Sequence, residues 1–336
     1  MDNLAHTLVG AALGMAGLKR KTGLGLATLM IAANLPDLDA SGFFVGENLA
    51  WRRGWTHGPI ALAVLPLLLA IAMVAFDRWQ MRRGTRPDGR LPVRFGWVLA
   101  LAYIGILSHP LLDFLNTYGI RCLMPFSDQW FYGDVLFIID VWMWSVLGIG
   151  IWLSRRRERR DASNAGRPAL IALLIVAGYC LAMGLGGRAA ERYAEREIVA
   201  AGMGKPQRVL ASPVPIDPFR RRIVFEIGNA YGFGDFRWAP APQFTTEPGL
   251  IPTRMNDPIV SRAAGQEKEV ADFLYWSRYP FAAIRPVKGG TEVIIGDARY
   301  NRRADDGRFT VRAIVPDRGA RTAILPKSQP PASPIE

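Results

Sequence analysis

Long apolar stretches separated by short charged loops dominate the first 190 residues of the chain. Four of them are nearly free of charge, and each has about the length that crosses a hydrocarbon core of roughly 30 Å: residues 59–76, 95–112, 135–153 and 168–187. Two shorter apolar runs, 4–18 and 24–35, precede them. The pattern predicts a mostly α protein with a polytopic helical membrane domain, made of a short N-terminal hairpin and four spans.

Basic residues gather in three of the loops between these runs: 19–21, 78–94 and 155–167. The positive-inside rule places all three loops in the cytoplasm, which requires the two short runs to form a hairpin with its basic turn inside. These loops carry much of the net charge of +12. We therefore expect no nucleic-acid partner, because a nucleic-acid interface needs a basic face with an exposed recognition element. The expected location is the cytoplasmic (inner) membrane, with membrane lipids as partners.

The last third of the chain has a different pattern. Alternating apolar and polar residues in 222–227, 291–295 and 308–312 are typical of strands. We expect residues 1–188 to form the membrane domain that carries the site, 189–325 to form a small β-rich domain on the extracytoplasmic side, and the proline-rich residues 326–336 to be a disordered tail.

Histidine and aspartate carry the candidate chemistry. The expected topology places all three histidines on the extracytoplasmic side, together with most aspartates of the membrane domain. His109 and Asp113 are four residues apart and share one helix face. Asp37 and Asp39 follow Pro36 in a turn, and Asp140 lies inside an apolar run, where a carboxylate is costly unless it is paired. The candidate metal ligands are His6, Asp37, Asp39, His57, His109, Asp113, Asp134 and Asp140.

Imidazole and carboxylate ligands without a thiolate indicate zinc, with manganese or iron as alternatives, rather than calcium. The two cysteines, Cys122 and Cys180, do not form a thiolate site. The candidate ligands exceed the needs of one tetrahedral zinc, so we expect one to three ions. Each residue taken alone also has a structural interpretation: a hydrogen-bonded interfacial histidine, a helix cap at Asp37 or Asp39, or an arginine partner for Asp140.

Several segments resemble one known family. They are Asp2 with His6, Leu35–Asp39, Arg53–Gly58, Ser108–Gly119, and Tyr132–Asp134 with Asp140. The sequence is similar to the YdjM-like inner-membrane metal-dependent hydrolases, also described as LexA-binding inner-membrane hydrolases. That family is distantly related to zinc-dependent phospholipases C and single-strand-specific zinc nucleases. Those enzymes add a His-x-x-x-Glu motif that this chain lacks, and Asp134 and Asp140 are the candidates to replace it.

The resemblance implies a membrane-embedded hydrolase of phosphoester bonds in lipid or envelope substrates. A metal-bound hydroxide would be the nucleophile, and Asp39, Asp113 and Asp140 would be the catalytic carboxylates. Two other interpretations stay open. A metal transporter or sensor is disfavoured because the inner halves of the spans are almost wholly apolar. An envelope scaffold would bind its partner through the C-terminal domain.

Overall fold

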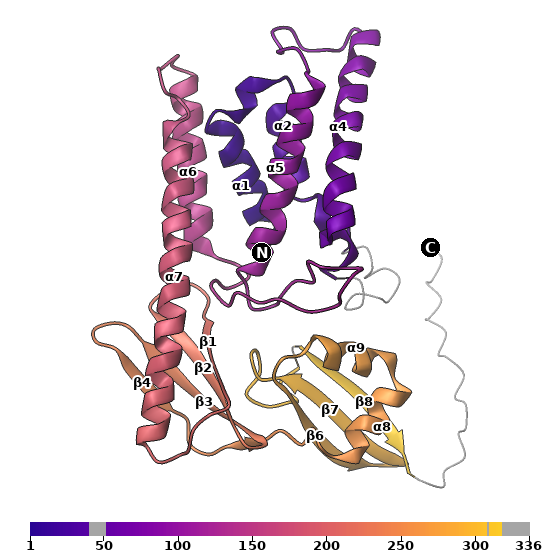
Figure 1. Ribbon diagram of the computed structural model, residues 1–336, viewed down its shortest axis with the longest axis vertical. Coiled ribbons are helices and arrows are strands. Elements are labelled where there is room, and N and C mark those ends of the chain that lie inside the picture. The colour runs from indigo at the N-terminus through magenta and orange to yellow at the C-terminus, as the bar shows by residue number, and fades with distance from the viewer. Residues whose placement is uncertain (40–51, 308, 318–336) are drawn as a thin grey trace, which may run out of the picture. The chain divides into compact units, whose positions relative to one another are not determined.

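The apolar runs of the first 190 residues form helices, shown in Figure 1. The computed structural model describes residues 1–39, 52–307 and 309–317. In this part of the chain the helices of the N-terminal region are α1 (Asn3–Met15), α2 (Gly25–Ala32), α4 (Pro59–Arg82), α5 (Phe95–Phe114), α6 (Val141–Glu158) and α7 (Arg167–Ala200). A short 3-10 helix, η1 (Leu18–Lys21), holds the basic turn between α1 and α2.

Three of the described helices are long and apolar enough to cross a membrane: α4, α5 and α7. The expectation of a fourth span over 135–153 is not confirmed. The helix there, α6, begins only at Val141, where the Asp140 carboxylate accepts a hydrogen bond from the Met143 amide and caps the helix. It ends at Glu158 and so includes three consecutive arginines, Arg155 to Arg157.

The helices approach closely where glycine faces a neighbour. A Cβ on Gly10 of α1 would lie 2.7 Å from the Leu29 carbonyl oxygen of α2. A Cβ on Gly105 of α5 would lie 2.6 Å from the Ala32 Cβ on the same short helix. Small residues at such contacts let backbones pack tightly in membrane bundles. They bring the C-terminal end of α2 against α5, one turn before His109.

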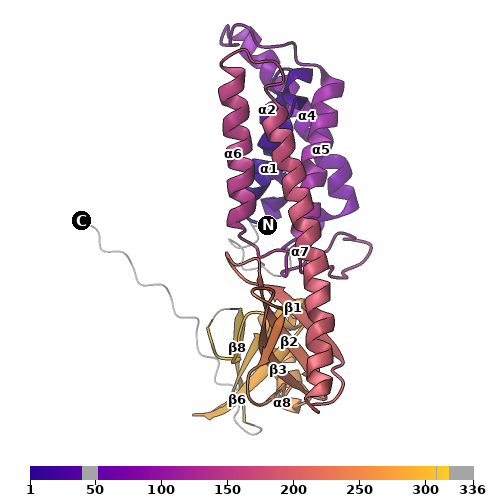
Figure 2. The ribbon, with the colours of Figure 1, turned by 90° about the vertical axis from the view of Figure 1, so that its left-hand side faces the viewer.

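The longest helix, α7, continues beyond the other helices to an antiparallel sheet, as both Figures 1 and 2 show. Its 34 residues span about 51 Å at 1.5 Å per residue, well over the thickness of a hydrocarbon core. The sheet has the order β1-β2-β3-β4, with β5 paired to β3. The strands are β1 (Arg208–Pro213), β2 (Arg220–Ile227), β3 (Ala230–Arg237), β4 (Gln243–Thr246) and β5 (Ile251–Pro252).

A shared core joins this sheet to the end of α7. Ala190, Ala194 and Ile198 pack against Ile223 and other buried residues of the sheet. Arg221 of β2 is buried, and its guanidinium donates to the Met183 carbonyl of α7 at 2.6 Å. Burial lowers the pKa of Arg221 to about 10. The first compact unit of the chain therefore runs from Met1 to Pro252 and contains both the helices and this sheet.

The second compact unit begins at Thr253. It contains α8 (Pro258–Gln266), α9 (Lys268–Trp276) and a three-stranded antiparallel sheet of β6 (Pro280–Val287), β7 (Gly290–Asp297) and β8 (Thr310–Pro316). The predicted small β-rich region after the membrane helices is thus confirmed. The predicted domain limits stay a prediction; residue 188 lies inside α7, and the predicted tail 326–336 lies outside the described residues.

Candidate metal centre

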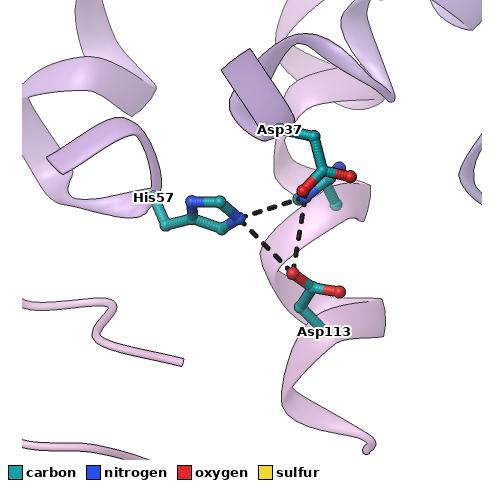
Figure 3. A group of neighbouring side chains, drawn as sticks. Asp37, His57 and Asp113 are labelled. Atoms are coloured by element: carbon teal, nitrogen blue, oxygen red, sulfur yellow. Dashed lines mark hydrogen bonds and ion pairs between the residues drawn. The ribbon is translucent and has the colours of Figure 1, made fainter. Parts of the chain in front are cut away.

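Four buried side chains from three segments converge in the helical region: Asp37, His57, His109 and Asp113. Asp37 follows the end of α2, His57 lies in the 3-10 helix η3 (Trp55–His57) just before α4, and the other two lie one turn apart on α5. Figure 3 shows Asp37, His57 and Asp113 pointing toward one another. One ligand atom from each of the four lies within 4.8 Å of the others.

Both histidines of the cluster are held through Nδ1. Nδ1 of His109 lies 2.7 Å from the carbonyl oxygen of Ala33, which can only accept a hydrogen bond, so this nitrogen carries the proton. Nδ1 of His57 lies 3.2 Å from Oδ2 of Asp39. A histidine that ligates a metal commonly donates its other ring nitrogen to a carbonyl or carboxylate in this way. Both residues therefore direct Nε2 into the cluster.

The distances between the inward-facing atoms fit a tetrahedral ion. The Nε2 atoms of His57 and His109 are 3.1 Å apart. Oδ2 of Asp113 lies 3.4 Å from Nε2 of His57 and 3.5 Å from Nε2 of His109. Oδ1 of Asp37 lies 3.8 Å from Nε2 of His109. Ligands about 2.0–2.1 Å from a tetrahedral zinc lie roughly 3.3 Å from one another. The atoms of His57, His109 and Asp113 thus have the spacing that a shared ion would require, and the Asp37 oxygen lies farther out, within 4.8 Å of the other three.

The carboxylate of Asp37 supports the same interpretation. The residue is buried, and neither of its oxygens accepts a hydrogen bond from the described residues. The nearest cation is Arg52, whose Nη2 is 3.7 Å away. A buried carboxylate without hydrogen bonds is costly unless a cation compensates it. The Asp37 carboxylate and the two inward-facing Nε2 atoms together show that the residues present fit a metal ion.

Electrostatics couple Asp39 to His57. Burial alone would raise the pKa of Asp39, but its hydrogen bond and ion pair with His57, with Arg52 nearby, keep that pKa below its usual value. Burial alone would lower the pKa of His57, and the hydrogen bonds with Asp113 and Asp39 raise it above its usual value. A proton on Nε2 of His57 would therefore compete with a metal ion for the same position.

Arg53 is a site residue that the list of expected ligands did not contain. Its side chain is buried, and Nε lies 3.0 Å from Oδ2 of Asp113. Nη1 donates to Oδ1 of Asn116 at 2.9 Å, and the guanidinium stacks on Tyr118. Its backbone has a φ of 53° and its amide donates to Asp39. The sequence signal was present, because Arg53 opens the segment Arg53–Gly58 that carries part of the family resemblance.

The profile of the YdjM inner membrane protein family matches residues 1–189. The chain belongs to this family. The match spans every residue of the cluster and ends within α7. No curated protein and no solved structure matches the chain. The expected resemblance to an inner-membrane family is confirmed, and the site of this YdjM-family chain could hold a metal ion.

The other expected ligands lie around the cluster or away from it. Asp39 contacts His57 from outside, as described above. His6 is buried beside the cluster: its ring stacks on His109 with centroids 3.8 Å apart, and Nε2 lies 3.3 Å from Oδ1 of Asp113. That same oxygen also contacts the Met1 ammonium group.

Asp134 and Asp140 are not among the residues that the described structure brings together in the cluster. Asp140 caps α6 and accepts a hydrogen bond from the Tyr179 hydroxyl at 2.9 Å. Asp134 lies beside Arg221, whose Nη1 is 3.4 Å from the Asp134 carbonyl oxygen. Their assignment as ligands, and that of Asp140 as a catalytic carboxylate, stays a prediction.

Proposed function

We propose that this YdjM-family chain is a membrane-embedded metal-dependent hydrolase that cleaves phosphoester bonds in lipid or envelope substrates. The observation that carries the proposal is the pair of Nε2 atoms 3.1 Å apart, each directed inward by an acceptor on Nδ1, between the buried carboxylates of Asp37 and Asp113. Such a donor set is typical of hydrolytic zinc, manganese and iron sites. The proposed location of the site is the extracytoplasmic side of the inner membrane.

Asp37, His57, His109 and Asp113 would hold the ion, and His6 adjoins them through the second oxygen of Asp113. A divalent ion there would supply Lewis-acid polarisation of a phosphoryl oxygen and activation of water at neutral pH. Asp39 fixes the ring of His57, and Arg53 fixes the carboxylate of Asp113. These contacts preorganise the cluster, which is the main contribution of a protein to such a site.

A phosphoester substrate fits the charge at the rim of the cluster. The Arg52 side chain is 25% exposed, and its guanidinium lies 3.7 and 3.9 Å from Asp37 and Asp39. Arginine is well suited to phosphate because its planar fork matches two phosphate oxygens. Arg52 is therefore our candidate for binding the anionic group of the substrate, and Arg52→Gln should raise KM more than it lowers kcat.

The test is hydrolysis of phosphoesters by the full chain in lipid nanodiscs, loaded with zinc or manganese. Phospholipids and soluble aryl phosphodiesters are the substrates. We expect turnover by the wild type and by Asp88→Asn, a control at an exposed aspartate in the basic loop, and a loss of at least 100-fold in His57→Ala and Asp113→Asn. Metal content is measured in parallel. A wild-type chain that retains its metal yet hydrolyses none of these substrates would refute the proposal.

A further inference from the structure

A groove runs between α6 and α7, away from the metal centre. Its volume is about 480 Å³, within the range of about 300–1,000 Å³ that is typical of small-molecule sites. The α6 side includes Ile149 and Leu153, and the α7 side includes Ile171 and Ile175. Between them, Gly150 meets Ala172, where a Cβ on the glycine would lie 2.4 Å from the alanine Cβ. The groove thus has a floor of small residues and apolar walls.

The groove follows the direction of both helices. On α6 its lining extends from Val146 to Arg157, which corresponds to about 16 Å at 1.5 Å per residue. That length is close to half of a hydrocarbon core of about 30 Å, or one leaflet. The two helices pack side by side in Figure 2, and the groove lies along α7, which is a candidate membrane span. Its walls are open, since Ile149 is 58% and Ile175 is 52% exposed.

A cation lies at one end of this apolar groove. Arg157 is exposed, and among the described residues its guanidinium has no hydrogen bond or ion pair. The adjacent Glu158 is bound to Lys19 of η1 at 2.5 Å and does not neutralise it. Six arginines and two acidic residues occupy the segment 155–167, so this end is strongly basic. The positive-inside rule predicts that it faces the cytoplasm.

We infer that this groove binds an anionic phospholipid of the leaflet next to the basic segment, with an acyl chain between α6 and α7 and its phosphate at Arg157. The two parts of the ligand match the two parts of the site: an apolar channel about one leaflet long, and at its basic end a guanidinium that forms no ion pair with the described residues. Basic pockets between membrane helices recognise acidic headgroups by the same combination. This lipid site is separate from the proposed hydrolytic centre and does not depend on it.

Native mass spectrometry of the detergent-purified chain, titrated with phosphatidylglycerol or phosphatidylcholine, tests the inference. We expect phosphatidylglycerol to bind the wild type at least fivefold more tightly than phosphatidylcholine. Arg157→Gln should weaken phosphatidylglycerol binding about fivefold, because it removes the direct charge-assisted hydrogen bond from the guanidinium to the lipid phosphate. Arg159→Gln removes the same charge two residues away, outside the groove, and should change binding less than twofold.

A second variant separates the groove from the charge. Leu153→Trp adds bulk to the apolar wall without altering the charge, and it should also weaken phosphatidylglycerol binding. Soluble glycerol phosphate should not compete, because it has no acyl chain. Equal effects of Arg157→Gln and Arg159→Gln would overturn the inference in favour of diffuse attraction to the basic segment. Equal affinity for the two lipids, or a dimer that covers the groove and excludes lipid, would also overturn it. Because Arg157 is exposed, the comparison of the two arginine variants holds even if Leu153→Trp fails to fold.

Discussion

Substitution of Asp39 tests whether the cluster is organised as a metal site with a supporting carboxylate. Oδ2 of Asp39 accepts the Arg53 amide at 2.5 Å and the Thr56 hydroxyl at 3.1 Å, and lies 3.2 Å from Nδ1 of His57. Asp39 does not belong to the group of four inward-facing candidate ligands. If this assignment is correct, its loss should weaken metal binding without abolishing it.

The expected magnitude depends on the replacement. Removal of a carboxylate that orients a metal-ligating histidine typically costs about 10–100-fold in metal affinity, which sets the expectation for Asp39→Ala. Asn keeps an oxygen that accepts hydrogen bonds but removes the charge. A hydrogen bond to a charged group contributes about 1.5–3 kcal/mol and a neutral one about 1 kcal/mol, so Asp39→Asn should lose about 1 kcal/mol, or about fivefold.

The assay is a competition titration of the detergent-purified chain with a chromogenic zinc chelator. Asp37→Asn, which changes a ligand, is compared directly, and Asp88→Asn is the control for loss of a carboxylate elsewhere. We expect the affinity to fall in the order wild type, Asp39→Asn, Asp39→Ala, Asp37→Asn. A zinc affinity of Asp39→Ala within twofold of the wild type would refute the supporting role. Complete loss of zinc in a folded Asp39→Asn variant would show instead that Asp39 is itself a ligand.

Three further outcomes follow from packing and charge. Gly105→Ala should destabilise the helical region by about 1–3 kcal/mol, because the added Cβ would overlap Ala32. Gly96→Ala is the control and should not destabilise it, because no atom lies within 4 Å of its added Cβ. Thermal unfolding in detergent compares the two variants. Asp297→Asn should destabilise the second unit by about 3–5 kcal/mol, because it leaves the buried Arg299 without its counter-ion. Protease cleavage of the residues after Pro252, measured at increasing urea concentrations, gives the unfolding midpoint of this unit. Burial alone would raise the pKa of Asp297, but Arg299 holds it below its usual value. The stabilisation from this pair is therefore fully present above about pH 4 and is lost as the pH falls toward the lowered pKa, so the urea midpoint should drop in wild type below pH 4 and change much less in Asp297→Asn.

The helical part of the fold could be predicted because the bilayer requires long apolar segments. The runs 59–76, 95–112 and 168–187 correspond to α4, α5 and α7, the three candidate spans. The run 135–153 did not predict where its helix begins. From its apolar composition we assigned residues 135–140 to the helix, but the Asp140 carboxylate caps α6, which begins at Val141. A composition average does not register one hydrogen bond at a helix end.

Spacing along the chain was informative for the part of the site where one helix carries two candidate ligands. His109 and Asp113 could be paired from their separation of four residues, and the structure places their Nε2 and Oδ2 atoms 3.5 Å apart. The approach of Arg53 to Asp113 could not be inferred in this way. It depends on a backbone with positive φ and on packing between segments 60 residues apart, neither of which has a local signature.

One proline connects the local sequence to the geometry of the whole cluster. Pro36 has no amide hydrogen to donate to the Ala32 carbonyl four residues before it, and α2 ends at Ala32, with a 3-10 turn over residues 35–39. The end of a helix leaves carbonyl groups without partners in the helix, and here the Ala33 carbonyl accepts the hydrogen bond from Nδ1 of His109. The same turn presents Asp37 to Nε2 of that histidine. The candidate ligand Asp37 and the carbonyl group that orients His109 thus both depend on where α2 stops.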